Sequence, residues 1–292
     1  MTTASSTTAH RTFPVAAPVE VSVRLARGAV TITAGDVTEA VVDLRPAHPG
    51  GQEALELIAR ARVELHGNSL VIHVPEHLEG FRFGRTPAVL VRAEVPTDSD
   101  VTAVLGAADI SLTGRVGDLR VRSGSGDVTA TESGDTSIRS GKGRVDLGSV
   151  ADVAVTTAAG DITVRHVRGD FELHTASGDI HVALTDRDGR AVTGAGRIVL
   201  DRTSRGSVSL KTAAGSVQVR HASEGDLSVN TVSGDITIGI TEGTVARLDC
   251  TSVTGQVRSH LQPTDAPSAD ERRLFVAARS VTGSVTVQRA TD

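Results

Sequence analysis

The sequence predicts an all-β fold: a single-chain parallel β-solenoid (β-helix) of about ten coils, most of them 17–21 residues long, behind a mostly-β N-terminal cap that contains one short helix. Three observations predict this fold. Glycines recur at a nearly constant spacing, apolar and polar residues alternate on both sides of each glycine, and no helix-length segment separates the units.

The repeat begins near residue 101 and is anchored on glycine. Spacings between successive anchors rise from 17 to 28 residues, and Ala108 holds the anchor position of a weaker first unit. Such self-similarity at a short period is typical of stacked repeat architectures. The anchors are Gly126, Gly143, Gly160, Gly178, Gly196, Gly215, Gly234, Gly255 and Gly283.

A β-branched apolar residue stands two positions after every anchor, and polar residues flank it. This alternation predicts a strand with one buried face. A second strand, with apolar residues seven and five positions before the anchor, completes each coil. We expect the coils to stack one on the next, in parallel and about 4.8 Å apart. The resulting structural ladder is Val128, Val145, Ile162, Ile180, Ile198, Val217, Ile236, Val257 and Val285.

A hydroxyl residue stands three positions before every anchor, at the expected corner between the two strands. A hydroxyl can satisfy backbone groups in a tight bend. The anchor glycine permits a positive φ or a close approach to the next coil. The corner hydroxyls are Ser123, Ser140, Thr157, Thr175, Thr193, Thr212, Thr231, Ser252 and Ser280.

The phrase T-x-S-G-D-I-x-V recurs as Thr175–Val182 and, with a final Ile, as Thr231–Ile238. It resembles the bacterial domain-of-unknown-function family labelled "putative adhesin", over roughly residues 100–290. The resemblance implies a β-solenoid and a non-catalytic role. It carries over no catalytic or ligand-binding residues.

Three regions are predicted along the chain. Residues 1–12 form a disordered N-terminus, residues 13–98 a β-rich capping region with a short helix near 53–62, and residues 99–289 the solenoid, with an inserted loop at 260–273. No cap follows the last coil, so an open strand edge is expected there. The cap strands are expected at Val19–Leu25, Val30–Ile32, Ala40–Leu44, Val63–Leu65, Leu70–Val74 and Val89–Val95.

Composition narrows the expected partners. The net charge is −5, and the chain has no Trp or Tyr and only five Phe, so neither a basic field nor base-stacking side chains favour nucleic acid. No apolar run is long enough to span a membrane, and no secretory signal opens the sequence. Cys250 is the only cysteine. We therefore expect a cytoplasmic protein with a protein partner or self-association and without a small-molecule site.

The aspartates that follow several anchors suggest calcium, as in other repeat proteins. However, the same column holds Arg144 and Arg197 among others, and calcium needs six to eight oxygen ligands. We interpret these aspartates as turn caps and the histidines as surface residues. The glycine-rich corners lack a following helix and a Walker lysine. No metal, cofactor or catalytic residue is assigned. The aspartates are Asp127, Asp161, Asp179 and Asp235.

Two basic features remain. Phe81, Arg82, Phe83 and Arg85 form a possible partner loop, because aromatic and arginine side chains are common interface anchors, although core packing of the two Phe residues is the simpler interpretation. Arg122 and Arg139 occupy equivalent outward positions in adjacent coils. We interpret that spot as a solvated face.

The leading hypothesis is a non-catalytic, adhesin-like scaffold that mediates protein or surface interaction. The first alternative is a cytoskeleton-like β-helix protein that polymerises end to end through its open last coil. The second is a carbohydrate-active β-helix enzyme, although no motif in the sequence proposes a pair of catalytic acids.

Overall fold

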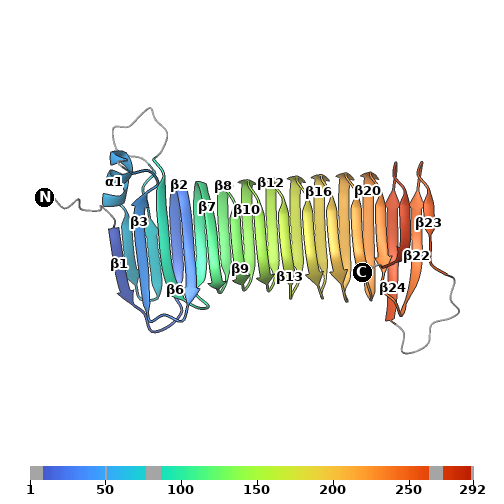
Figure 1. The fold of residues 1–292 in the computed structure, drawn as a ribbon, viewed down its shortest axis with the longest axis horizontal. Coiled ribbons are helices and arrows are strands. Elements are labelled where there is room, and N and C mark those ends of the chain that lie inside the picture. Colours follow the sequence, from blue (N-terminus) through green and yellow to red (C-terminus); the bar gives the residue numbers. More distant parts are fainter. Residues whose placement is uncertain (1–8, 50, 77–86, 263–271, 291–292) are drawn as a thin grey trace. The chain divides into compact units, whose positions relative to one another are not determined.

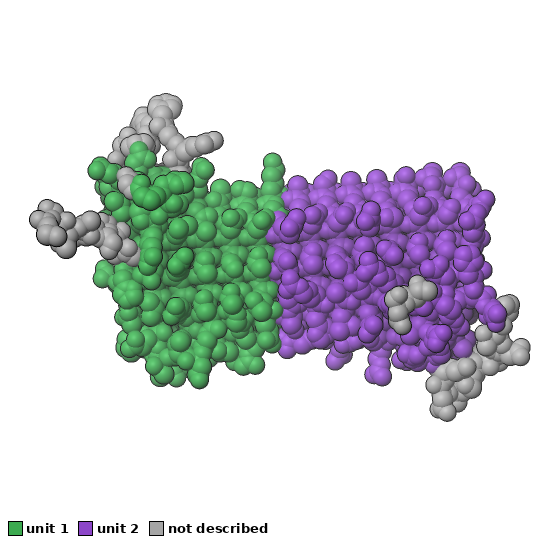
Figure 2. Space-filling model, in the orientation of Figure 1, with its two compact units in different colours: residues 1–143 green, residues 144–292 purple. Residues whose placement is uncertain are grey.

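The computed structural model describes residues 9–49, 51–76, 87–262 and 272–290. It is an all-β parallel solenoid with one short helix in the described part (Figure 1). The chain divides into two compact units, residues 1–143 and 144–292, which Figure 2 colours separately. Each unit is described by itself.

Unit 1 holds ten strands and the helix in its described residues. The helix confirms the prediction near residues 53–62, and it buries Ala54, Leu57 and Ile58. The elements are β1 (Ala9–Pro14), β2 (Glu20–Gly35), β3 (Glu39–Pro46), α1 (Gln52–Ala59), β4 (Arg62–His66), β5 (Ser69–His73), β6 (Val89–Pro96), β7 (Asp100–Arg115), β8 (Leu119–Ser125), β9 (Val128–Ser133) and β10 (Thr136–Lys142).

Strand β2 lies inside the stack of unit 1. It pairs in parallel with β7 on one side and with β5 and β6 on the other, while β8 and β9 pair with β7, and β10 pairs with β8. Antiparallel pairs β4–β5, β3–β6 and β1–β3 continue the sheet outward. The parallel coils thus begin at Glu20, well before residue 99. Residues 9–12, expected to be disordered, belong to β1.

Gly28 shows why β2 fits as a coil. Its φ is +138°, and a Cβ there would collide with the backbone of Val89 on β6. Val30 and Ile32, two and four positions later, are buried. Gly28 therefore holds the place of an anchor glycine, although no Gly-Asp pair marks it in the sequence.

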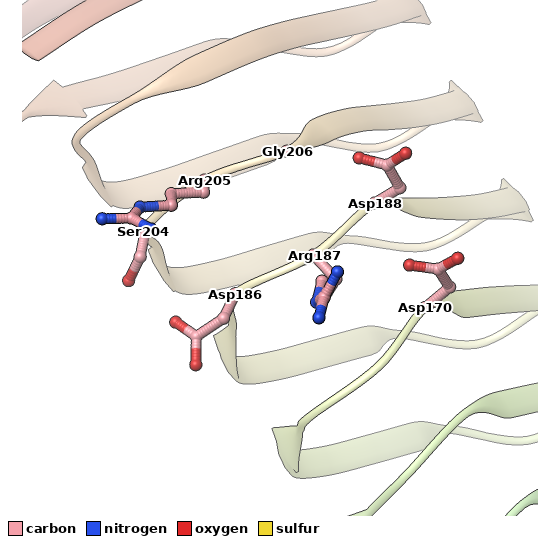
Figure 3. A pocket seen from close by; sticks show the side chains of 7 residues that line it. All are labelled: Asp170, Asp186, Arg187, Asp188, Ser204, Arg205 and Gly206. Atoms are coloured by element: carbon pink, nitrogen blue, oxygen red, sulfur yellow. The ribbon is translucent and has the colours of Figure 1, made fainter.

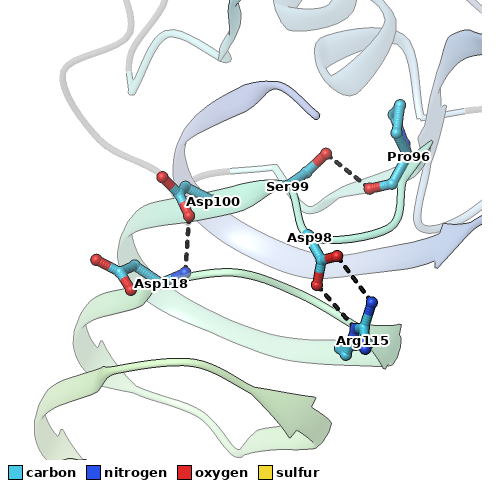
Figure 4. A network of polar contacts seen from close by, with 6 residues as sticks. All are labelled: Pro96, Asp98, Ser99, Asp100, Arg115 and Asp118. Carbon is cyan, nitrogen blue, oxygen red and sulfur yellow. Dashed lines mark hydrogen bonds and ion pairs between the residues drawn. The ribbon is translucent and has the colours of Figure 1, made fainter. Parts of the chain in front are cut away.

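A polar network holds the short connection from β6 to β7 (Figure 4). The fully buried Ser99 donates from Oγ to the Pro96 carbonyl at 2.7 Å and accepts from the Val19 N–H at 3.0 Å. Asp98 has φ +64° and pairs with Arg115 at 2.8 Å. These bonds fix the turn after which β7 runs along β2.

Unit 2 is built of parallel strands in two series, and strands of one series pair in register. Even-numbered strands β12 to β20 pair in succession, as do odd-numbered strands β11 to β21. The strands are β11 (Val145–Val150), β12 (Val153–Ala159), β13 (Ile162–Val167), β14 (Phe171–Ser177), β15 (Ile180–Thr185), β16 (Gly189–Ala195), β17 (Ile198–Thr203), β18 (Ser207–Ala214), β19 (Val217–Ala222), β20 (Gly225–Ser233), β21 (Ile236–Ile240), β22 (Thr244–Ser252), β23 (Val257–Ser259), β24 (Arg272–Ser280) and β25 (Val285–Arg289).

Stacking in sequence order fails at the last coil, where the prediction was wrong. Strand β24 lies between β20 and β22, and β25 lies between β21 and β23. The coil that comes last in the chain (β24 and β25) is therefore the second-last in the stack of unit 2, and the coil that precedes it in sequence (β22 and β23) lies outermost. Leu274, Val276 and Ala278, in the apolar column positions of strand β24, are buried, whereas the outer coil carries Ser259 in an apolar column. Placing the more apolar coil inside buries more apolar area.

The structure buries eight of the nine ladder residues, each no more than 1% exposed: Val128, Val145, Ile162, Ile180, Ile198, Val217, Ile236 and Val285. Val257 is 47% exposed, so the expectation of burial is wrong there. It lies on the outermost strand β23, which pairs on one edge only among the described residues of unit 2.

One inward column, seven residues after each of the first six glycine anchors, was not predicted from the sequence. Its members end the strand that follows each of these anchors and are at most 3% exposed: Ser133, Val150, Val167, Thr185, Thr203 and Ala222. Because Ser and Thr interrupt the apolar residues, the column does not stand out in the sequence.

Candidate functional site

Six of the nine corner hydroxyls donate a hydrogen bond to a backbone carbonyl of a neighbouring coil. Thr193 donates from Oγ1 to the Gly178 carbonyl at 3.0 Å, and Thr212 to that of Gly196 at 3.2 Å. Thr175, Thr231 and Ser280 make the same bond to Gly160, Gly215 and Gly234. Ser123 and Ser140 instead donate to a carbonyl two residues further along the chain, and Ser252, on the outer coil, donates to the Gly283 carbonyl. All the corner hydroxyls are buried except the half-buried Ser252. Thr157 Oγ1 has no hydrogen-bond partner among the described residues, and the other eight stabilise the corners through their hydrogen bonds.

Three of the four singled-out aspartates make the turn-capping bond that was predicted. Asp161 Oδ1 accepts the Asp179 N–H at 2.9 Å, Asp179 accepts the Arg197 N–H at 2.7 Å, and Asp235 accepts the Ser284 N–H at 2.8 Å. Asp127 donates its own N–H to Asp109. The carboxylates of Asp161, Asp179 and Asp235 thus each accept a backbone N–H of a neighbouring coil, so they cap a corner by joining two coils.

A second aspartate column, which sequence reasoning missed, caps the opposite corner. Its bonds run from the N–H of Asp118 to Asp100, of Asp170 to Asp152, and of Ser207 to Asp188, at 2.7, 2.8 and 2.7 Å. The signal was present in the sequence, because an aspartate stands eight residues before most anchors, including Asp118, Asp135, Asp152, Asp170, Asp188 and Asp226.

A hollow at this corner in unit 2 is lined by three aspartates (Figure 3). Asp170, Asp186 and Asp188 line it together with Arg187 and Arg205. Figure 3 shows the carboxylate of Asp186 pointing away from the other two. Asp188 is already bonded to a backbone N–H, and Asp186 lies 3.7 Å from His166. Among the residues that the structure describes, no group of three or more His, Cys, Asp or Glu side chains could hold a metal ion.

The histidines among the described residues are exposed or half-buried, as expected for surface residues. His181 Nε2 lies 2.8 Å from Asp201, and His174 Nε2 lies 3.1 Å from Glu172. The partner loop at residues 81–85 falls outside the described residues.

Burial raises the pKa of the Cys250 thiol. A backbone hydrogen bond with Ala278 lowers this pKa and the Asp249 carboxylate raises it, but burial has the largest effect.

The basic spot of Arg122 and Arg139 is larger in the structure than in the sequence. Arg139 is the register partner of Arg122, Arg122 of Val104, and Val104 of Arg24. We call Arg24, Arg122 and Arg139, with Val104 between them, the arginine row. It lines a shallow hollow of about 430 Å³ on the outward face of unit 1, and it is the candidate binding site.

No helix in the described part of the chain is long and apolar enough to cross a membrane.

No curated protein matches the sequence. A solved structure of a "putative adhesin" from Parabacteroides distasonis is similar at 15% identity and a TM-score of 0.49, over 97% of this chain and 96% of that one. A "putative adhesin" from Parabacteroides merdae aligns at 10% identity and a TM-score of 0.46, over 97% and 96%. A "putative lipid binding protein" from Parabacteroides distasonis aligns at 13% identity and a TM-score of 0.45, over 97% of both chains.

The family model for Toastrack DUF4097 matches residues 20–290, which takes in the coil at β2 as well as the glycine-anchored repeats. This match confirms the resemblance that the T-x-S-G-D-I-x-V repeats indicate. The chain belongs to the Toastrack DUF4097 family.

Proposed function

We propose that this chain is a non-catalytic, adhesin-like β-solenoid scaffold that mediates protein or surface interaction. One observation carries the proposal. The polar residues that recur in the repeat use their side chains mostly in hydrogen bonds with backbone groups of neighbouring coils, as Thr193 and Asp179 do. The repeat therefore builds a stack, and recognition is left to the exposed outward columns.

The proposal is tested by separating binding from turnover. The full chain is incubated with acidic and neutral polysaccharides, and both the retained polymer and its length are measured. Retention of the acidic polymer without shortening of either polymer is expected. Shortening that disappears in Asp170→Asn and Asp188→Asn variants would instead establish a carbohydrate-active enzyme acting at the hollow in Figure 3.

Self-assembly is the second candidate, favoured by the open coil of unit 2. Strand β22 pairs with β24 and with no other strand in the described residues, and Val257 on β23 is 47% exposed. Unpaired edges are templates for another chain. Sedimentation across concentrations tests this candidate: Val257→Lys should abolish any assembly, whereas Val232→Lys, at an exposed valine of an inner coil, should not. A monomer at all concentrations removes this candidate.

The cytoplasmic location predicted from the sequence belongs to the same proposal. Cell fractionation of the natural producer tests it, and recovery of the chain on the outer surface would contradict it.

A further inference from the structure

The arginine row is straight and spans four neighbouring strands of unit 1. Arg24 lies on β2, Val104 on β7, Arg122 on β8 and Arg139 on β10, each the register partner of the next. At about 4.8 Å per strand, the row is roughly 14 Å long. His73 on β5 extends it beyond Arg24. Positive charge is thus aligned across the strands and comes from segments far apart in the sequence.

The three arginines have no carboxylate within ion-pair distance among the residues that the structure describes. Two other arginines of unit 1, Arg115 and Arg120, are paired: Arg115 lies 2.8 Å from Asp98, and Arg120 lies 2.9 Å from Asp118. Like charges directly opposite each other on neighbouring strands destabilise a sheet. The face therefore carries a repulsion between Arg122 and Arg139 that a bound anion would relieve.

Hydroxyl groups and one exposed apolar side chain also line the hollow of the arginine row. Thr102 and Ser137 lie beside it, on the exposed face, and their hydroxyls make no hydrogen bond within the described structure. This contrasts with eight of the nine corner hydroxyls, which donate to backbone carbonyls. Val104, in the middle of the row, is 43% exposed. The hollow thus presents the guanidinium groups of the arginine row, the hydroxyls of Thr102 and Ser137, and the small apolar surface of Val104.

We propose that the arginine row binds a linear carboxylated polysaccharide, a polymer of uronic acid residues. The inference rests on the proposed function, a non-catalytic binding scaffold, and names its partner class. Guanidinium groups bind planar carboxylates through two parallel hydrogen bonds. The hydroxyls of Thr102 and Ser137 match sugar hydroxyls, and Val104 matches the apolar face of a sugar ring. A straight groove suits an extended polymer chain.

Other polyanions fit this face less well. Single-stranded nucleic acid binds largely by stacking bases on aromatic rings, and the chain has no Trp or Tyr. An extended acidic peptide presents side chains on one face only about every 6.6 Å, which runs out of step with arginines at strand spacing. A bilayer surface carries anionic headgroups but has no ordered row of hydroxyls to match those of Thr102 and Ser137.

The test uses the full chain and polygalacturonate, titrated calorimetrically at low and high salt, with dextran as the neutral polymer. The triple variant Arg24→Gln, Arg122→Gln, Arg139→Gln is compared with Arg45→Gln, Arg190→Gln, Arg202→Gln. The control removes equal charge from exposed arginines that likewise have no carboxylate partner within the described structure. We expect polygalacturonate but not dextran to bind, more weakly in high salt. The row variant should bind about tenfold more weakly or worse, and the control like the wild type.

Three outcomes overturn the inference. Equal loss in both variants would show a non-specific charge effect, and no loss in the row variant would place the binding surface elsewhere. Binding to phosphatidylcholine–phosphatidylserine vesicles but not to polygalacturonate, lost in the row variant, would make the partner a membrane. The proposed function fails separately: if polygalacturonate is bound by the row but shortened, the inference stands and the non-catalytic role does not.

Discussion

Substitution of one anchor glycine measures how closely two coils approach. Gly178 has φ +140°, and a Cβ there would lie 2.6 Å from the Gly160 carbonyl carbon and closer still to its oxygen. Both obstacles are backbone, so no side chain can rotate away. Gly178→Ala therefore combines a backbone conformation unfavourable by about 1–2 kcal/mol with an overpacking cost of about 1–3 kcal/mol. We expect the free energy of unfolding to fall by about 2–5 kcal/mol.

Two other glycines supply matched controls. Gly67 has φ +60° but nothing within 4 Å of an added Cβ, and Gly35 has neither a positive φ nor a close neighbour. Gly67→Ala should cost about 1 kcal/mol, and Gly35→Ala should be neutral or slightly stabilising. Urea unfolding followed by circular dichroism gives the three values. If Gly178→Ala and Gly67→Ala cost the same, the close approach of the coils is refuted.

Three further predictions concern the core, a corner and the thiol. Ile180→Asp buries a charge without a partner at a fully buried ladder position and should cost more than about 4 kcal/mol, whereas Thr129→Asp on the outward face should stay within about 0.5 kcal/mol; wild-type-like melting of the first variant would contradict the assigned register. Thr193→Val removes the hydrogen bond to a corner carbonyl and should cost about 1–3 kcal/mol, measured by the same urea titration, and a neutral result would show that the hydroxyl column is dispensable. Because the pKa of the Cys250 thiol is raised, its alkylation at neutral pH should be slower than that of free cysteine. The folded state holds this proton more tightly than the unfolded state, so this contribution to stability is fully present below the thiol's unfolded-state pKa and is lost as the pH rises through its folded-state pKa; alkylation faster than that of free cysteine would contradict the raised pKa.

The regular coils could be predicted because every column repeats one requirement. Ile162, Ile180 and Ile198 are register partners, and each occupies the same apolar position after its anchor. The corner hydroxyls and the aspartate caps follow from the same repetition. A single coil would be hard to recognise in the sequence. Because every coil packs against coils of the same shape, equivalent positions need similar residues, and the repeated columns become recognisable.

The order of the coils at the chain ends could not be predicted in the same way. Any coil with the right columns can pair with any other, so the insertion of β24 and β25 inside β22 and β23 depends on which coil buries more apolar surface. Ser259 in an apolar column is the one hint in the sequence. At the other end, β2 has the apolar alternation of a coil but not its Gly-Asp signature.

Only part of the candidate site could be predicted from the sequence, because only part of it belongs to the regular repeat. Arg122 and Arg139 belong to the repeat, so their alignment can be read from its period. Arg24 joins them only through the pairing of β2 with β7, across about eighty residues of sequence. No local pattern specifies that pairing.

Disulfide trapping at the last coils tests the stacking most directly. In a Cys250→Ser background, Thr237 and Thr286 are replaced by cysteine in one variant, and Thr237 and Arg258 in another. Thr286 is the register partner of both Thr237 and Arg258, so it lies between them. A disulfide needs Cα atoms within about 7 Å, which one strand spacing allows and two do not. We predict rapid oxidation of the first pair and none of the second; the reverse would contradict the inserted coil and the register of the solenoid.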